Sequence, residues 1–256
     1  MMHTQEEMLN RRDGPPLAYR YTPGREPTVV FIHGLGSDMS GGKAIHLEQH
    51  CSRSGGAFLC FDCRGHGLSG GRFEEGCIGD WRADVLEMLD RVTPGPVVLV
   101  GSSMGGWLML LAALARPERI RGLVGIAAAP DFTHDLILPS LSVEDRRVLA
   151  RDGVLLAPSA YGEPIPITSL LLEDGEGHLL LRRPIALDCP VHLLHGQLDP
   201  DIPWQTALRL AAVIAGGAVT VELIKDGDHR LSRDDDDLRR IAAAVDRVLQ
   251  RPDPHG

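Results

Sequence analysis

The stretch from residue 97 to residue 114 constrains the fold more than any other part of the chain. Residues 97–100 are Val-Val-Leu-Val, a run typical of a buried strand. Residues 107–114 are almost all apolar and predict a helix that is buried on most sides. Between them lies Gly-Ser-Ser-Met-Gly, which matches G-x-S-x-G with Ser103 at its centre. This order predicts a nucleophile elbow, a strained turn that exposes the serine hydroxyl above the amino end of a helix.

The glycines of this motif have a structural reason. A turn this sharp brings backbone close to backbone, so Gly101 and Gly105 must lack side chains. The chain matches the motif a second time around Ser69. The residues after that match are Arg-Phe-Glu-Glu and predict no buried helix, so we interpret Ser69 as a loop serine.

The rest of the chain alternates strand patterns with helix patterns. This alternation predicts a mostly parallel sheet with helices on both faces. A short edge strand is expected at residues 17–21, before the series begins. The expected strands are 28–32, 57–62, 123–128, 191–194 and 220–224, and the expected helices are 42–53, 80–92, 203–215 and 234–250.

One segment departs from this alternation. Residues 130–188 contain six prolines, short apolar clusters and one expected helix at 143–151. We therefore predict that residues 1–129 and 189–256 form an α/β core and that 130–188 is a small lid inserted into it.

A serine hydroxyl becomes a nucleophile when a histidine, itself oriented by a carboxylate, takes its proton. In this arrangement the serine comes first, then the acid, then the histidine, each after a strand. Only His229 directly follows the last expected strand among glycine and short polar residues, so it is the expected base. Asp199 follows the strand at 191–194 and is the expected acid, with Asp201 as the alternative.

The ends of the strands also predict which backbone groups stabilise the oxyanion, the negatively charged oxygen that forms when the serine attacks a carbonyl. The backbone N–H groups of Met104, after the serine, and of Leu35, in the glycine-rich turn after the strand at 28–32, are the expected donors. His33 and His66 fit a structural role in turns better than a catalytic one. Cys60 and Cys63 have the C-x-x-C spacing but lie in a strand pattern without a second ligand pair, so we expect core packing and no metal there.

The composition of the chain limits the classes of partner that the protein is expected to bind. The 256 residues carry a net charge of −9 and no basic cluster, which argues against nucleic acid and anionic membrane surfaces. No apolar run approaches the length of a membrane span, and the first residues are polar, so a cytoplasmic protein is expected without membrane insertion. Five cysteines, an odd number, suggest reduced thiols. No cofactor is expected, and the oligomeric state stays open.

Three motifs carry a family resemblance. They begin at Gly101 (GSSMGGWLML), at Leu193 (LLHGQLD) and at Asp226 (DGDHR). With these motifs the chain resembles the α/β-hydrolase superfamily over nearly its whole length. More narrowly it resembles a mitochondrial branch of abhydrolases, known as palmitoyl-protein thioesterases and as esterases of acyl glucuronides. The resemblance places the nucleophile, acid and base at the three residues inferred above from chain order.

The expected function is therefore hydrolysis of carboxylic esters or thioesters through an acyl-enzyme on Ser103. The substrate would be a small or protein-linked acyl compound. Alternatives are a catalytically silent ligand-binding protein on the same fold and a peptidase. We expect apolar lid residues to line an acyl slot, namely Leu136, Leu138, Ile167 and Leu171.

Overall fold

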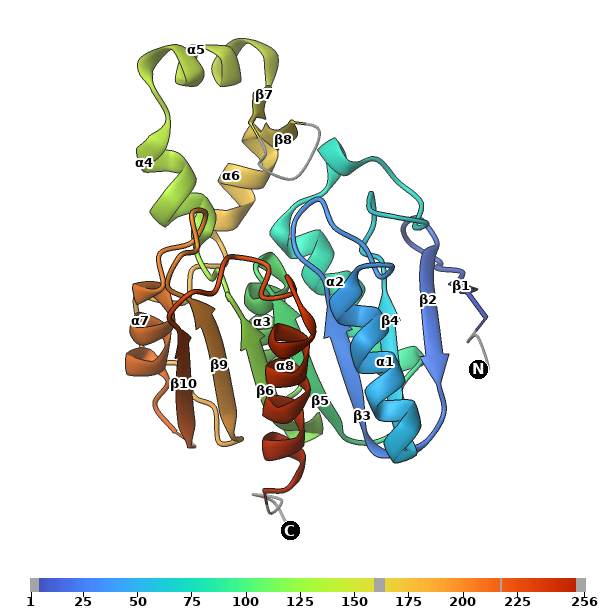
Figure 1. The fold of residues 1–256 in the computed structure, drawn as a ribbon. Coiled ribbons are helices and arrows are strands. Elements are labelled where there is room, and N and C mark those ends of the chain that lie inside the picture. Colours follow the sequence, from blue (N-terminus) through green and yellow to red (C-terminus); the bar gives the residue numbers. More distant parts are fainter. Residues whose placement is uncertain (1–4, 159–163, 217, 252–256) are drawn as a thin grey trace.

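A sheet of eight strands runs through the centre of the molecule (Figure 1). The computed structural model describes residues 5–158, 164–216 and 218–251. The strands of this sheet are β1 (Glu7–Leu9), β2 (Leu17–Thr22), β3 (Arg25–Ile32), β4 (Gly56–Phe61), β5 (Val97–Ser102), β6 (Ile120–Ile126), β9 (Val191–Gly196) and β10 (Val219–Ile224).

The order of the strands is β1-β2-β4-β3-β5-β6-β9-β10. From β4 to β10 all neighbours are parallel, whereas β1 and β2 pair in the antiparallel sense. This confirms the predicted fold class. The expected edge strand at 17–21 is instead an inner strand, because β1 pairs along its outer side. β1 is only three residues long and mostly exposed, so it has no apolar alternation that sequence analysis could detect.

Helices cover the sheet on both faces. The longer helices are α1 (Gly42–Ser54), α2 (Ile78–Arg91), α3 (Met104–Ala115), α7 (Gln205–Val213) and α8 (Asp235–Leu249). Two short helical turns, η1 (Phe73–Glu75) and η2 (Pro117–Arg119), lie between them. In Figure 1, α1 and α8 lie in front of the sheet, while α2 and α3 lie behind it.

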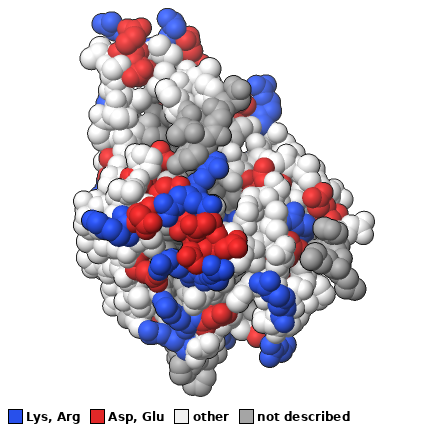
Figure 2. Space-filling view, in the orientation of Figure 1, with Lys and Arg blue, Asp and Glu red and all other residues white. Residues whose placement is uncertain are grey.

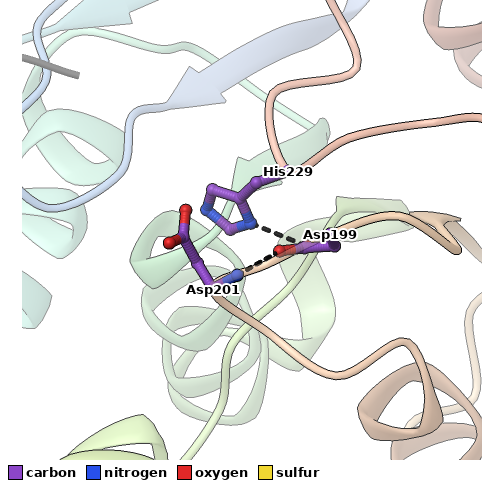
Figure 3. A group of neighbouring side chains, drawn as sticks. All are labelled: Asp199, Asp201 and His229. Atoms are coloured by element: carbon purple, nitrogen blue, oxygen red, sulfur yellow. Dashed lines mark hydrogen bonds and ion pairs between the residues drawn. The ribbon is translucent and has the colours of Figure 1, made fainter. Parts of the chain in front are cut away.

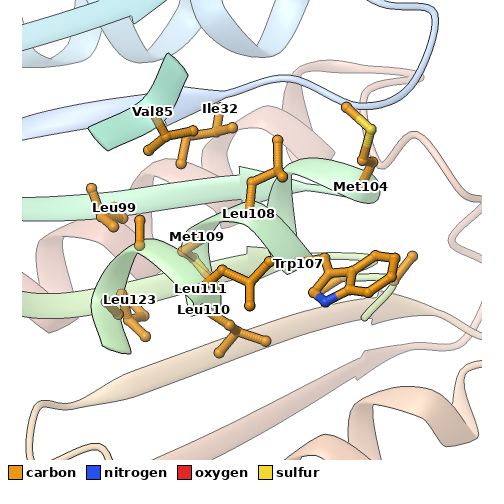
Figure 4. Close-up of a cluster of buried hydrophobic side chains, with 14 of the residues drawn as sticks. Ile32, Val85, Leu99, Met104, Trp107, Leu108, Met109, Leu110, Leu111 and Leu123 are labelled. Atoms are coloured by element: carbon orange, nitrogen blue, oxygen red, sulfur yellow. The ribbon is translucent and has the colours of Figure 1, made fainter. Parts of the chain in front are cut away.

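Alternation along the strands produces two hydrophobic cores. On β3, Val30 and Ile32 pack in the cluster that contains α2, α3 and α7, while Val29 and Phe31 pack in the cluster that contains α1 and α8. Helix α3 lies in the larger cluster, where Trp107 and Leu108 are fully buried (Figure 4). Burial of α3 on nearly all sides explains why its sequence is apolar all round.

Between β6 and β9 the chain leaves the sheet and forms a projection at the top of Figure 1. Its elements are η3 (Thr133–Ile137), α4 (Leu138–Ser140), α5 (Val143–Asp152), β7 (Val154–Ala157), β8 (Ile165–Thr168) and α6 (Ser169–Glu176). Sequence analysis predicted α5, which has a capping box formed by Ser142 and Asp145. It missed the antiparallel β7–β8 pair and α6, because Pro166 and the short apolar clusters hide the period of each element.

The two ends of this projection are joined at its base. The buried carboxylate of Asp131 accepts hydrogen bonds from the N–H groups of Leu180 and Leu181, both 2.8 Å long. Arg182 adds an ion pair to the same carboxylate at 3.0 Å. These three partners offset part of the cost of burying the charge, although burial still raises the pKa of Asp131. They hold the chain at one point where it enters and leaves the projection.

The face shown in Figure 2 carries both signs of charge side by side, including the end of the projection formed by α5. None of the described helices combines the length and the apolar character needed to cross a membrane.

Candidate active site

Ser103 lies at the turn between β5 and α3, in a conformation that non-glycine residues rarely adopt. Its backbone angles are φ 54° and ψ −120°. Its N–H donates to the carbonyl of Ile126 on β6 at 2.9 Å, which fixes the turn against the neighbouring strand. Strained backbone that the surroundings hold in place is a recurrent property of functional residues.

The flanking glycines are required by close contacts. A Cβ on Gly101 would lie 2.3 Å from the carbonyl oxygen of Gly105, and one on Gly105 would lie 2.2 Å from the carbonyl oxygen of Ile32. Both distances are far below van der Waals contact, so a side chain at either position would force the elbow apart. The interpretation of these two glycines from the sequence therefore agrees with the structure.

The structure brings Ser103, His229 and Asp199 together in one series of hydrogen bonds. Nε2 of His229 lies 3.0 Å from Oγ of Ser103, and Nδ1 of His229 lies 2.7 Å from Oδ2 of Asp199. Asp199 lies in the loop after β9 and His229 in the loop after β10. The loops touch at Gly196, where a Cβ would lie 2.3 Å from the carbonyl oxygen of Gly227.

The side chain of Asp199 is fully buried and surrounded by donors. Its Oδ1 accepts the N–H groups of Asp201 and Ile202, each at 2.8 Å. Burial alone would raise the pKa of Asp199, but the hydrogen bonds from His195 and His229 outweigh it and the pKa lies well below its usual value. The carboxylate is therefore ionised at neutral pH.

The carboxylate of Asp201 occupies a different place from that of Asp199. Figure 3 shows it beside the His229 ring, while only its backbone nitrogen reaches Asp199. Ligand atoms of Asp199, Asp201 and His229 lie within 4.8 Å of one another. A cation there would compete with the proton that Nδ1 of His229 shares with Asp199. The cluster therefore fits a proton-sharing pair better than a metal site.

The loop of Leu35 lies against Ser103. A Cβ on Gly34 would be 3.2 Å from Cβ of Ser103. No turn or loop hydrogen bond within the described parts of the chain uses the N–H of Leu35 or of Met104, and both residues line the cavity described below. These observations are compatible with the donor role that the sequence predicts for the two N–H groups.

His33 and His66 hold this loop. The N–H of Cys63 donates to Nε2 of His33 at 3.1 Å, so the other ring nitrogen carries the hydrogen and donates to the carbonyl of Gly34 at 2.8 Å. Nε2 of His66 accepts the N–H of Gly36 at 3.2 Å. Burial, assisted by His33, lowers the pKa of His66 to about 3. Both rings thus have structural roles.

Ser69 is also structural. Its hydroxyl accepts the N–H of Ala18 at 2.9 Å and donates to the carbonyl of Asp62 at 2.6 Å. It joins β2 to the loop after β4 and stands outside the hydrogen-bonded series at Ser103. Cys60 and Cys63 are buried, and burial raises the pKa of the Cys60 thiol to about 12, as core packing requires.

A cavity of about 640 Å³ opens at Ser103 and His229, between the sheet and the projection. This volume is in the range typical of small-molecule sites. Apolar side chains from both sides line most of it, among them Phe31, Phe73, Met104, Phe132, Ile137 and Ile165. Lys43, Asp201 and Arg230 line a polar part.

The four predicted substrate-binding residues do not line this cavity. Ile167 and Leu171 are buried in the core that contains α3, and Leu138 packs against the same core. Leu136 lines a separate, smaller pocket of about 110 Å³. The cavity instead uses Ile137 and Ile165. Ile137 projects at a different angle from its neighbours Leu136 and Leu138, as successive helical residues do. Ile165 precedes Ile167 by two residues and lies at the less buried end of β8, where it packs against the core that holds Ile167 rather than within it.

The fold, the elbow and the strand-end loops together define the class of protein. A model of the α/β hydrolase fold family matches residues 27–152. The chain belongs to the α/β-hydrolase family and is a hydrolase enzyme.

Within the family, the chain is 42% identical over 247 residues to the mouse protein "Palmitoyl-protein thioesterase ABHD10, mitochondrial", covering 95% of this chain and 82% of that one. Among solved structures it resembles α/β hydrolase domain-containing protein 10 from mouse, with a TM-score of 0.88 and 41% identity over 96% of this chain and 98% of that one. A putative hydrolase from Agrobacterium vitis S4 superimposes with a TM-score of 0.91 and 37% identity, over 97% and 99% of the two chains.

These relatives correct one expectation. The polar first residues favoured a cytoplasmic protein, whereas the mouse and human relatives are named as mitochondrial. The prediction of a cytoplasmic location is therefore wrong. Its basis was weak in physical terms, because signals for mitochondrial import are amphipathic and need no long apolar segment.

Proposed function

We propose that this hydrolase cleaves carboxylic esters and thioesters through an acyl-enzyme on Ser103. The observation that carries the proposal is the series Ser103–His229–Asp199, with contacts of 3.0 and 2.7 Å, whose Ser103 and His229 line a largely apolar cavity. In the first step Oγ of Ser103 attacks the acyl carbon while its proton passes to Nε2 of His229. Asp199 accepts from Nδ1 and stabilises the imidazolium that forms.

The negative charge of the tetrahedral intermediate would fall on the former carbonyl oxygen. The N–H groups of Leu35 and Met104 are the proposed donors to it. Collapse of the intermediate breaks the bond to the leaving group, which takes the proton from His229. Water then repeats the sequence and releases the acid, regenerating the hydroxyl of Ser103.

The proposed substrates carry medium or long acyl chains, and these chains would lie along the apolar part of the cavity. The naming of the mouse relative as a palmitoyl-protein thioesterase supports this class, and acyl-glucuronide-type esters belong to the same chemistry. A thiolate leaves without prior protonation more readily than an amine does, so amides are expected to be poor substrates. We further propose that residues 130–188 act as a lid over a core made of residues 1–129 and 189–256.

Labelling with a fluorophosphonate probe tests the first half of the proposal, because the probe reacts only with an activated serine. A silent binding protein on the same fold would not be labelled. A panel of p-nitrophenyl esters and acyl-CoA thioesters of increasing chain length tests the second half. A higher kcat/KM for acetyl than for octanoyl and palmitoyl substrates would contradict the acyl slot. Turnover of peptide amides at rates similar to those of esters would favour a peptidase.

A further inference from the structure

A second histidine contacts the carboxylate of Asp199. His195 is the fifth residue of β9 and its side chain is completely buried. Its Nε2 lies 3.1 Å from Oδ2 of Asp199 and 3.0 Å from the carbonyl oxygen of Ile202. Oδ2 is the same oxygen that faces Nδ1 of His229. Two imidazole rings therefore approach one carboxylate oxygen, and the hydrolytic sequence proposed above uses only one of them.

The partners of His195 determine which ring nitrogen carries hydrogen. The carbonyl of Ile202 can only accept, so a contact of 3.0 Å with Nε2 requires a hydrogen on that nitrogen. Nδ1 is buried and has no hydrogen-bond partner among the described residues. A proton there would be a buried, unpaired charge, which is costly. The ring is therefore neutral, and its single N–H is shared between Ile202 and Asp199.

With this donor, each oxygen of Asp199 has two hydrogen bonds. Oδ1 is held by the backbone N–H groups of Asp201 and Ile202, and Oδ2 by His195 and His229. We propose that His195 is a positioning residue, which fixes the Asp199 carboxylate in the plane that suits His229 and takes up part of its negative charge. This inference rests on the proposed function, because it gives Asp199 the role of orienting acid.

Other ionisable groups surround the pair, and they must stay constant in any test. Asp201 contributes a carboxylate from the same loop, within 4.8 Å of the Asp199–His229 pair. Asp228 and Arg230 flank His229 in sequence, and both interact electrostatically with Lys43 of α1. None of these groups is altered by a substitution at position 195.

The test compares three variants of the full chain. His195→Phe keeps the bulk of the ring and removes the donor. His195→Gln keeps a donor, because the amide nitrogen of glutamine occupies nearly the place of Nε2. His192→Phe makes the same chemical change at another buried histidine of β9, which contacts Glu222 and not Asp199.

The readouts are kcat and KM for a short p-nitrophenyl ester and the pH dependence of kcat/KM. Without the donor, Asp199 is less well oriented, so His195→Phe should lower kcat about 10-fold to 100-fold with little change in KM. The carboxylate also offers more of its charge to His229, which favours the imidazolium. The acidic limb of the profile should therefore move to higher pH by about half a unit.

His195→Gln should recover most of kcat and return the acidic limb of the kcat/KM profile to its wild-type pH. His192→Phe should resemble the wild type in kcat and in the position of this limb. An acidic limb that stays in place in His195→Phe, or equal loss in His195→Phe and His195→Gln, would overturn the proposal and leave His195 a packing residue.

A measurement on the wild-type protein tests the proposal even if the variants fail to fold. Nitrogen-15 NMR of the histidine rings distinguishes the two tautomers, and His195 should show hydrogen on Nε2 across the pH range of activity. Hydrogen on Nδ1 instead would overturn the proposal without any variant. Failure of the proposed function would look different, because Ser103 would then not be labelled by the fluorophosphonate in the wild-type protein.

Discussion

Ser103 combines a strained backbone with a free direction of approach for a substrate. Its φ of 54° is held by the N–H bond to Ile126 and by the packing of two glycines. The adjacent Ser102 is the last residue of β5 and is buried. Two serines that are neighbours in sequence thus have opposite roles, one in the sheet and one at the turn.

Removing the hydroxyl of Ser103 should therefore remove every reaction that needs a serine nucleophile. We expect Ser103→Ala to abolish ester hydrolysis and fluorophosphonate labelling. Ser102→Ala and Ser69→Ala should keep both, although Ser69→Ala loses two hydrogen bonds and should be less stable by about 1–3 kcal/mol. In-gel fluorescence after labelling and thermal melting give the two measurements. Full labelling of Ser103→Ala would exclude it as the nucleophile.

The two aspartates of the loop after β9 offer a matched comparison. Asp199→Asn should lower kcat by about 10³-fold to 10⁴-fold, since the amide neither orients the His229 ring correctly nor supports its positive form. Asp201→Asn should change kcat less than about tenfold, because only the backbone of Asp201 reaches Asp199. Steady-state kinetics on one ester separates the two. A larger loss in Asp201→Asn would transfer the role of acid to that residue.

At the scale of secondary structure, the loops after the strands could be predicted because each strand has a clear apolar run. The runs at β5, β9 and β10 fix where the chain leaves the sheet, and the glycines mark the turns that follow. Contacts between residues of different strands and loops could not be predicted in this way. That His195 and His229 reach one oxygen of Asp199 depends on the side-chain directions of strand β9 and of the two loops after β9 and β10, which no local pattern encodes. The same holds for the cavity wall, which includes Ile165 and not Ile167.

The buried His66 leads us to predict that the free energy of unfolding falls in acid. The pKa of His66 in the folded protein is about 3, against an ordinary value of about 6.5 in the unfolded chain. Between these values the unfolded state binds more protons, so stability is lost as the pH falls below about 6.5. From pH 7.5 to pH 5 this one residue should cost on the order of 2 kcal/mol of the free energy of unfolding.

His66→Gln removes the titration but keeps an acceptor for the N–H of Gly36. The loss of stability between pH 7.5 and pH 5, measured by urea unfolding, should be smaller in this variant than in the wild type. His33 is also buried with a lowered pKa and is unchanged in both proteins, so part of the pH dependence should remain. Identical pH dependence in the two proteins would contradict a buried neutral His66.

At the scale of the whole molecule, the cavity is made by two parts of the chain that meet over Ser103. The sheet supplies Phe31 and the turn after it, and the β7–β8 pair supplies Ile165. Ile165 also lies against the Leu35 turn, since its Cδ1 is 3.5 Å from where a Cβ of Gly36 would be. The projection therefore helps to shape the site itself.

Ile165→Ser should accordingly reduce long-chain turnover selectively. We expect kcat/KM for an octanoyl ester to fall about five- to tenfold, the effect of losing about 1–1.4 kcal/mol of apolar contact. The value for an acetyl ester should change less than about twofold. Leu156→Ser is the control, because Leu156 is in the same β7–β8 pair but is 64% exposed and does not line the cavity. Equal losses for both chain lengths would argue against an acyl slot at Ile165.

The base of the projection has a consequence for protein engineering. Asp131 joins the outgoing chain to Leu180 and Leu181 on its return, so the sheet meets the projection through a closed junction of fixed geometry. The entropic cost of closing a loop across such a junction grows slowly with loop length. A change of length between residues 132 and 179 should therefore leave the strands on either side in register, provided that Ile167 and Leu171, which are buried in the core that contains α3, are kept.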